Sequence, residues 1–263
     1  MKDLRGLTAL VTGAAGGMGR QFATQLMEQG CRVILTDLDA ARLRDTAREI
    51  LEGGVAFPGS IAGLIEADLG GSQGCIGIFE KAGELAGHVD ILVNNAGTIT
   101  YGDFHEVPPE RWETLMQVNL LAPMRLTHLF LPGMLSRGSG HIVFMSSVAG
   151  FIPTSQGTPY SCSKFGLRGF GMGLWGEVRA RGVDVTCVYP WWVMTGLLKS
   201  PEFGTARVGR LPLPGLITDR PERVVREIVT AMRKGRLHCY PGVFAKGAWL
   251  VSRIVPLISR QAH

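Results

Sequence analysis

Long apolar runs are missing from this sequence. Among its 263 residues, no uninterrupted apolar segment approaches the ~20 residues that a helix needs to cross a bilayer. The first residues, Met1 to Arg5, lack the apolar region of a secretory signal peptide. A membrane-spanning or secreted protein is therefore not expected, and the sequence predicts a soluble, cytoplasmic one.

Clustered cysteines are also absent. The five cysteines are odd in number, lie far apart and form no CxxC pair: Cys31, Cys75, Cys162, Cys187 and Cys239. This spacing indicates neither a zinc site nor a disulfide framework. We therefore expect no bound metal, and small buried thiols in a reducing compartment.

Basic residues are not concentrated in any one segment. The 27 lysine and arginine residues outnumber the 22 acidic ones and give a net charge of +5, but they are scattered along the chain. No basic block has interleaved aromatic residues, so nucleic-acid binding is not expected. A mildly basic surface instead suits an anionic cofactor.

What the sequence has in abundance is glycine, at 36 residues, and apolar residues, at 46%. Short apolar runs alternate with helical patterns along the whole chain, without repeats or a low-complexity linker. Alternation of this kind predicts an α/β fold, namely a Rossmann-type, doubly wound parallel sheet in three layers (α/β/α). We expect one domain over residues 1–263, with ligands bound at the carboxyl ends of its strands.

The first strand and helix are joined by a glycine-rich turn. The apolar run from Leu7 to Val11 ends in Thr12-Gly13-Ala14-Ala15-Gly16-Gly17-Met18-Gly19, and a helical pattern follows as far as Gly30. Such glycines let backbone N–H groups and a helix N-terminus approach a pyrophosphate. No Lys-Ser/Thr pair follows the turn, which excludes a nucleotide-hydrolysing P-loop. The segment therefore predicts a dinucleotide site.

An acidic residue follows the second predicted strand, Arg32 to Thr36. Asp37 lies about twenty positions beyond the turn, where a carboxylate can bind the adenosine ribose diol. It would repel the 2′-phosphate of NADP, and no arginine follows it, so NAD is favoured over NADP. The alternative is that Asp37 is the N-cap of a helix from Asp39 to Glu52.

The next segments are less regular. We place the third strand at Ile65 to Asp68 and treat residues 53–64 as irregular, followed by a helix over 75–87. A strand over 89–93 then ends in Asn94-Asn95-Ala96-Gly97, whose small residues allow backbone to approach a ligand. A helix over 108–130 contains Asn119, a polar residue among apolar ones. One interpretation of Asn119 is that it only satisfies a backbone carbonyl at a helix kink.

A hydroxyl, a phenol and an ammonium come together in the middle of the chain. Ser147 ends an apolar run that begins at Ile142, and Tyr160 and Lys164 follow at the start of a helical segment. The i, i+4 spacing places phenol and ammonium on one helix face. Because a nearby cation lowers the pKa of a tyrosine from its ordinary value of about 10, this arrangement predicts a proton-transfer site.

The same helix carries a stripe of small residues. Its members recur at spacings of three or four: Cys162, Gly166, Gly169, Gly173, Gly176 and Ala180. Each glycine costs about 1 kcal/mol of helix propensity relative to alanine, so we expect close packing as compensation. The partner is either the symmetry mate in a dimer or the subunit's own sheet.

The last third of the chain completes the fold. We expect a strand over 183–188, a mobile substrate lid over 196–217, a helix over 221–234 and a strand over 237–240. The tail, residues 243–263, is apolar with interspersed Lys246, Arg253 and Arg260. It could lie on a membrane, cover the substrate pocket or pack between subunits. Packing is the favoured interpretation, and membrane contact is less favoured.

Five motifs occur together in order: Thr12-Gly13-x-x-x-Gly17-x-Gly19, Asn94-Asn95-Ala96-Gly97, Asn119, Ser147 and Tyr160-x-x-x-Lys164. In this order and spacing, over nearly its whole length, the chain resembles the single-domain short-chain dehydrogenase/reductase family. The family usually has Pro-Gly where this chain has Pro190-Trp191. A bulky aromatic side chain there could reshape the end of the cofactor site that binds nicotinamide, or it could form one wall of the substrate pocket.

The resemblance implies a role for each matching residue. Tyr160 is the general acid/base, and Lys164 lowers its pKa and binds the nicotinamide ribose. Ser147 orients the substrate oxygen, and Asn119 positions a water that links Lys164 to solvent. The implied NAD contacts are Gly13, Gly17, Met18, Gly19, Asp37, Asp68, Leu69, Asn95, Ala96, Gly97, Tyr160, Lys164, Val193 and Thr195. Of these, Val193 and Thr195 would meet the carboxamide.

The expected activity is hydride transfer between NAD and a secondary alcohol or ketone. Aromatic residues near the site (Phe151, Trp191, Trp192 and Phe203) suggest a hydrophobic substrate such as a steroid, fatty or aromatic alcohol. We expect a homodimer or homotetramer. The alternative is a catalytically silent dinucleotide-binding regulator or scaffold, which the complete set of Asn119, Ser147, Tyr160 and Lys164 disfavours. A peripheral membrane protein is a third reading.

Overall fold

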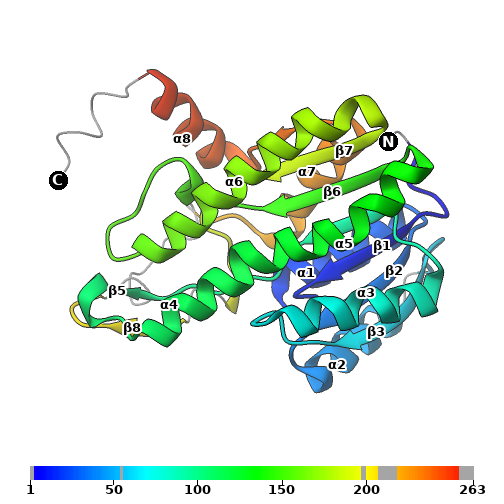
Figure 1. The fold of residues 1–263 in the computed structure, drawn as a ribbon, viewed down its shortest axis with the longest axis horizontal. Coiled ribbons are helices and arrows are strands. Elements are labelled where there is room, and N and C mark those ends of the chain that lie inside the picture. The colour runs from blue at the N-terminus through cyan, green and yellow to red at the C-terminus, as the bar shows by residue number, and fades with distance from the viewer. Residues whose placement is uncertain (1–2, 54–55, 197–199, 207–217, 255–263) are drawn as a thin grey trace.

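One parallel sheet organises the molecule. In the computed structural model, which describes residues 3–53, 56–196, 200–206 and 218–254, seven strands of the described chain form this sheet in the order β3-β2-β1-β4-β6-β7-β9 (Figure 1). The strands are β1 (Thr8–Thr12), β2 (Arg32–Asp37), β3 (Ser60–Glu66), β4 (Ile91–Asn94), β6 (Gly140–Met145), β7 (Val183–Val188) and β9 (His238–Cys239). The predicted doubly wound fold is confirmed, and the chain reverses its direction of winding between β1 and β4.

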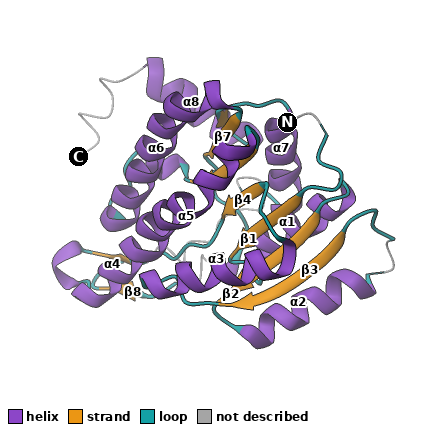
Figure 2. Ribbon diagram, turned by 45° about the vertical axis from the view of Figure 1, so that its right-hand side comes forward, coloured by secondary structure: helices purple, strands orange, loops and turns teal. Residues whose placement is uncertain are grey.

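Helices cover both faces of the sheet (Figure 2). On one face lie α1 (Gly17–Glu28), α2 (Ala40–Glu52) and α7 (Pro221–Arg233). On the other lie α3 (Ser72–Ala86), α5 (Ala122–Arg137) and α6 (Thr158–Val178). β1, β4, β6 and β7 are buried almost throughout, because both of their faces carry apolar side chains that pack against helices.

The third strand is longer than predicted and begins earlier. It starts at Ser60 opposite Arg32 and runs beside β2, with a bulge at Ala62 where the register shifts. The expected strand at Ile65 to Asp68 is therefore wrong at both ends. A glycine masked the pattern: a Cβ on Gly63 would lie 2.5 Å from Leu85 Cδ1, so the absent side chain lets α3 pack closely.

The predicted continuous helix over 108–130 is three segments. α4 (Pro109–Met116) leads into a π-helical turn (Gln117–Leu121), and α5 continues from Ala122. π-Helical turns insert one residue into a helix and often mark functional positions. Here the turn carries Asn119, which is fully buried.

A second, small sheet lies beside the main one. β5 (Tyr101–Gly102) pairs in parallel with β8 (Glu202–Phe203). The second strand belongs to the expected lid over 196–217, of which residues 197–199 and 207–217 lie outside the described part of the chain. The described part of this segment is thus fixed to the loop that follows β4.

The tail forms helix α8 (Gly242–Ile254), which extends from the edge of the molecule (Figure 1). It contacts α7 and the short turn Val148–Gly150, while residues 255–263 lie outside the described chain. Over the described residues, no helix has both the length and the apolar character that crossing a membrane requires.

The two faces of α6 differ in what they contact. Leu167, Gly171 and Leu174 are buried against the sheet. The small-residue stripe lies on the other face, where added Cβ atoms at Gly169, Gly173 and Gly176 would meet nothing within 4 Å. The alternative that the stripe packs on its own sheet is therefore wrong.

Close packing between α6 and the sheet makes one glycine substitution costly. A Cβ at Gly171 would lie 2.5 Å from Cys187 Sγ and 2.9 Å from Phe144 Cδ2. Gly83, an exposed residue of α3, has an open position instead. Both alanine variants gain about 1 kcal/mol of helix propensity, but overpacking costs G171A about 1–3 kcal/mol. In urea denaturation we expect G171A to be less stable than G83A by about 1–3 kcal/mol, and equal stability would contradict this packing.

Candidate active site

The glycine turn and the Asn95 segment are packed directly against each other. Gly13 has φ +64°, and an added Cβ would lie 2.8 Å from Ala96 Cα. A Cβ at Gly19 would lie 2.1 Å from the Gly13 carbonyl oxygen. Side chains at either position would therefore force the turn apart. α1 begins at Gly17, and its first turn carries no acidic residue that would repel an anion.

Polar side chains connect the ends of β1 and β4. The Thr12 hydroxyl donates to the Val93 carbonyl (3.3 Å) and accepts from the backbone N–H groups of Asn95 (3.0 Å) and Ala96 (2.9 Å). The Asn95 amide donates to the Thr12 carbonyl at 2.8 Å. Asn95 thus bridges β1 and β4. Thr12 carries an equal share of this network, although the sequence marked it only as part of the glycine turn.

Asp37 faces the turn rather than capping a helix. Its Oδ2 accepts a hydrogen bond from the Ala15 N–H at 2.9 Å. The N-cap of α2 is Asp39, whose carboxylate accepts from Arg42 N–H at 3.0 Å, so the capping interpretation of Asp37 is wrong. Arg42 also approaches the turn, with Nη2 3.5 Å from the Ala15 carbonyl.

The other predicted adenosine contacts follow β3. Asp68 accepts from the Gly70 N–H at 2.7 Å, which shapes the turn into α3, and Leu69 is buried beneath it. These residues follow the carboxyl end of β3, next to the strand that carries Asp37. The structure thus places Asp37, Asp68 and Leu69 along one edge of the sheet.

The predicted proton-transfer residues converge at the end of β6. Ser147 follows this strand in extended conformation, and its hydroxyl accepts from the Ala149 N–H at 3.1 Å and hydrogen-bonds the Tyr160 phenol. Burial raises the pKa of Tyr160 to about 12, and the bond with Ser147 opposes this shift. Desolvation of the phenolate is the larger effect.

Lys164 lies one helical turn beyond Tyr160. Its Nζ donates to the Met145 carbonyl at 2.8 Å and lies 5.4 Å from the centroid of the Tyr160 ring. Burial lowers the pKa of Lys164 to about 8. Burial thus disfavours the charged form of both groups, and the lowering of the Tyr160 pKa by Lys164 stays a prediction.

Asn119 ties the π-helical turn to the segment after β4. Its Oδ1 accepts from the Thr98 N–H and its Nδ2 donates to the Thr98 carbonyl, both at 2.8 Å. An added Cβ at Gly97 would lie 3.3 Å from Asn119 Oδ1 and 3.6 Å from Lys164 Nζ. Asn119 thus satisfies backbone groups, as its alternative interpretation expected, and stands beside the lysine as well.

The segment after β7 closes the other side. Thr195 Cγ2 would lie 3.3 Å from a Cβ at Gly17, which places Thr195 at the glycine turn. Val193 forms a β-bridge with Asp219. Trp191 stacks on Phe244 of α8, with ring centroids 6.4 Å apart.

One residue near Tyr160 was missed by the sequence analysis. Tyr101 of β5 is buried in a cluster with Ile99 and Ala206 that packs against Tyr160. Burial raises the pKa of Tyr101, which keeps its phenol protonated. No motif signals this position, because it depends on the pairing of β5 with β8.

The comparisons with known proteins agree with this geometry. The family model described as short chain dehydrogenase matches residues 7–202. The chain is 30% identical to epidermal retinol dehydrogenase 2 of Mus musculus over 97% of its length and 80% of the relative's. It is 32% identical to D-beta-hydroxybutyrate dehydrogenase of Cupriavidus necator, covering 86% of this chain and 83% of that protein.

A solved structure extends the likeness. A metagenomic short-chain oxidoreductase in complex with NADP superposes with a TM-score of 0.71 at 31% identity, covering 88% of this chain and 91% of that chain. Sequence relatives, a solved fold and the arrangement of the motifs agree. The chain belongs to the short-chain dehydrogenase/reductase family of oxidoreductases.

Proposed function

We propose that this protein is an NAD-dependent oxidoreductase that transfers a hydride between nicotinamide and a hydrophobic secondary alcohol or ketone. The observation that carries the proposal is the convergence of Ser147, Tyr160 and Lys164 at the carboxyl end of β6, two strands from the glycine turn. A protein that only bound a dinucleotide would have no use for a buried phenol with a hydroxyl on one side and an amine on the other.

The residues present fit a dinucleotide. The absence of side chains at Gly13 and Gly19 lets the turn pack tightly before the N-terminus of α1, where backbone N–H groups would bind a pyrophosphate. Asp37 would bind the adenosine ribose, and Thr195 would meet the carboxamide beside Gly17. Nicotinamide, when bound, accepts or supplies the hydride, and the protein's own task is positioning and proton transfer.

Proton transfer would pass through Tyr160. Its phenol is held by the Ser147 hydroxyl, so an alcohol or carbonyl oxygen between them could bond both groups. Lys164, anchored by the Met145 carbonyl, would keep a positive charge or a donor near the phenol. Asn119 would position a water that connects Lys164 to solvent. These are the roles that the family resemblance implies, assigned here to the contacts that these side chains make.

The substrate would meet an apolar wall. Ile99, Tyr101 and Ala206 surround Tyr160, and Trp191 stands beyond β7. One of the relatives is named a retinol dehydrogenase, and retinol is an apolar alcohol. Another is named a hydroxybutyrate dehydrogenase, and hydroxybutyrate is a small polar alcohol. We favour the apolar class because the described side chains that surround Tyr160 in this cluster are apolar or aromatic.

The role of Tyr160 is tested by Y160F. Removing the phenol hydroxyl takes away the proton donor and acceptor, so we expect kcat to fall by about 10²–10⁴-fold or more on a panel of alcohols and ketones. NAD binding should persist, measured by fluorescence titration. Y240F, which loses a hydroxyl but keeps its ring contacts with Tyr189 and Trp249, is the matched control and should stay active. Full activity in Y160F would exclude Tyr160 from the chemistry.

The preference for NAD is tested by D37N. The neutral amide removes the charge that repels a 2′-phosphate, so we expect the ratio of NADP to NAD affinity to rise about tenfold. D39N removes a carboxylate two residues away and retains an N-cap, and it should leave the ratio unchanged. Cofactor titrations of both variants decide. An unchanged ratio in D37N, or tighter binding of NADP by the wild type, would contradict the preference.

We also propose that the stripe on α6 packs in a homodimer. The stripe is exposed in the subunit at Gly169, Gly173 and Gly176, whereas Gly166 packs against Leu120. Phe165 and Met172 beside it are 40% and 39% exposed. Leucine at Gly169 would fill the open position and hold two helices apart, so G169L should elute later than the wild type on a sizing column. An unchanged assembly would count against a contact through this face.

A further inference from the structure

Helix α8 presents an apolar side to solvent. Val243, Phe244, Leu250 and Val251 are 70%, 41%, 51% and 57% exposed. Val243 and Leu250 are seven residues apart, as are Phe244 and Val251, so these side chains share one side of the helix, with Gly247 between them. Exposed apolar side chains that are contiguous in this way mark interaction sites more often than isolated ones do.

The opposite side of α8 holds the helix in place. Ala245 is fully buried, and Trp249 contacts the Tyr240 ring with centroids 5.3 Å apart. Phe244, at the border between the two sides, stacks near Trp191, and the helix contacts the turn after Ser147. Because this side packs on the body, the apolar outer side faces away from it.

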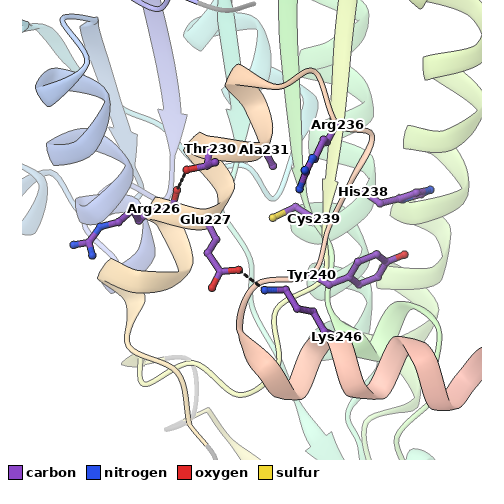
Figure 3. Close-up of a pocket in the computed structure, with 9 residues that line it drawn as sticks. All are labelled: Arg226, Glu227, Thr230, Ala231, Arg236, His238, Cys239, Tyr240 and Lys246. Atoms are coloured by element: carbon purple, nitrogen blue, oxygen red, sulfur yellow. Dashed lines mark hydrogen bonds and ion pairs between the residues drawn. The ribbon is translucent and has the colours of Figure 1, made fainter.

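Cations border the apolar side. Among its described residues α8 has no acidic side chain, while Lys246 and Arg253 lie seven residues apart on one flank. Lys246 bonds Glu227 of α7 at 2.9 Å, and Arg253 lies over the Trp249 ring at 5.9 Å. Between α7, β9 and α8 there is a cavity of about 350 Å³ to which Arg236 and Lys246 contribute positive charge and Glu227 a carboxylate (Figure 3). Arg226 also lines it, but its guanidinium points away from the cavity and pairs with Glu222.

We propose that the outer side of α8 is a peripheral docking surface for an anionic lipid membrane. Its apolar side chains would enter the boundary between headgroups and acyl chains, and Arg253 with the cations around the cavity would meet the phosphates. A second copy of the chain fits this surface less well. Two copies facing each other would bring two α8 helices together. The described residues of each helix include Lys246 and Arg253 but no carboxylate that could pair with the other helix's cations.

The placement of α8 gives this docking a consequence. The helix contacts the turn Val148–Gly150 directly after Ser147, and its Phe244 stacks near Trp191. A membrane bound at α8 would therefore lie near the turn that follows Ser147, and an apolar alcohol could pass from the bilayer toward the active site. This last step rests on the proposed function, whereas docking itself requires no turnover.

Flotation of the purified full-length protein with vesicles tests the proposal. We expect binding to vesicles that contain phosphatidylglycerol, weaker binding to pure phosphatidylcholine, and loss of the difference at high salt. L250S/V251S should lower the vesicle partition coefficient about tenfold or more, because two apolar side chains no longer leave water. R253Q should lower it about fivefold on the anionic vesicles alone.

L51S is the matched control. Leu51 is 58% exposed, and its helix α2 lies on the far side of the molecule from α8, so L51S should float like the wild type (Figures 1 and 2). Flotation of L250S/V251S equal to that of the wild type, or no flotation of the wild type at low salt, overturns the proposal. A wild-type dimer that L250S/V251S dissociates, without flotation, assigns the surface to a second copy and overturns it too. If L250S/V251S fails to fold, R253Q decides alone.

Discussion

The hydrogen bond between Lys164 Nζ and the Met145 carbonyl positions the rest of the site. It links the first turns of α6 to the carboxyl end of β6 and holds an amine where burial disfavours its charge. The Ser146 hydroxyl adds a second link by donating to the Lys164 carbonyl at 2.9 Å. With helix and strand fixed in this way, Ser147 at the strand end and Tyr160 on the helix can only face each other.

Burial then sets the electrostatics of the pair. It raises the pKa of Tyr160 to about 12 and lowers that of Lys164 to about 8, so the protein by itself favours the neutral form of the phenol. The Ser147 hydrogen bond opposes the first shift but does not cancel it. A further positive charge or donor near the phenol is needed for it to release a proton near neutral pH. The site therefore couples proton transfer to whatever else is bound beside Tyr160, which a solvent-exposed tyrosine could not do.

Much of this arrangement follows from sequence, because parallel strands that alternate with helices place their carboxyl ends along one edge. Asp37, Asn95 and Ser147 could each be assigned to that edge from the end of an apolar run. The limits of β3 could not be predicted from the sequence. Gly63 interrupts the apolar pattern because Leu85 packs against it, and the strand bulges at Ala62. The π-helical turn at Asn119 was hidden for a similar reason: its bonds to Thr98 are tertiary, and helical periodicity carries no trace of them. The pKa of Tyr160 depends on burial, which a spacing of four residues does not report.

The segments around Tyr101 are held differently from the predicted catalytic residues. Pairing of β5 with β8 and the carbonyl of Gln156, which accepts the Gly102 N–H at 2.8 Å, fix the segment around Tyr101. Asp103, directly after β5, links this segment to the residues after β8 and to Gln156. Its carboxylate accepts hydrogen bonds from the Thr205 hydroxyl at 2.7 Å and from the Gln156 amide at 3.4 Å. Gln156 has φ +57°, a strained conformation for a residue other than glycine, and it is held by these bonds. Local pairings of this kind are weaker than a buried sheet, so the wall beside Tyr160 can change without disturbing the proton-transfer residues at the end of β6.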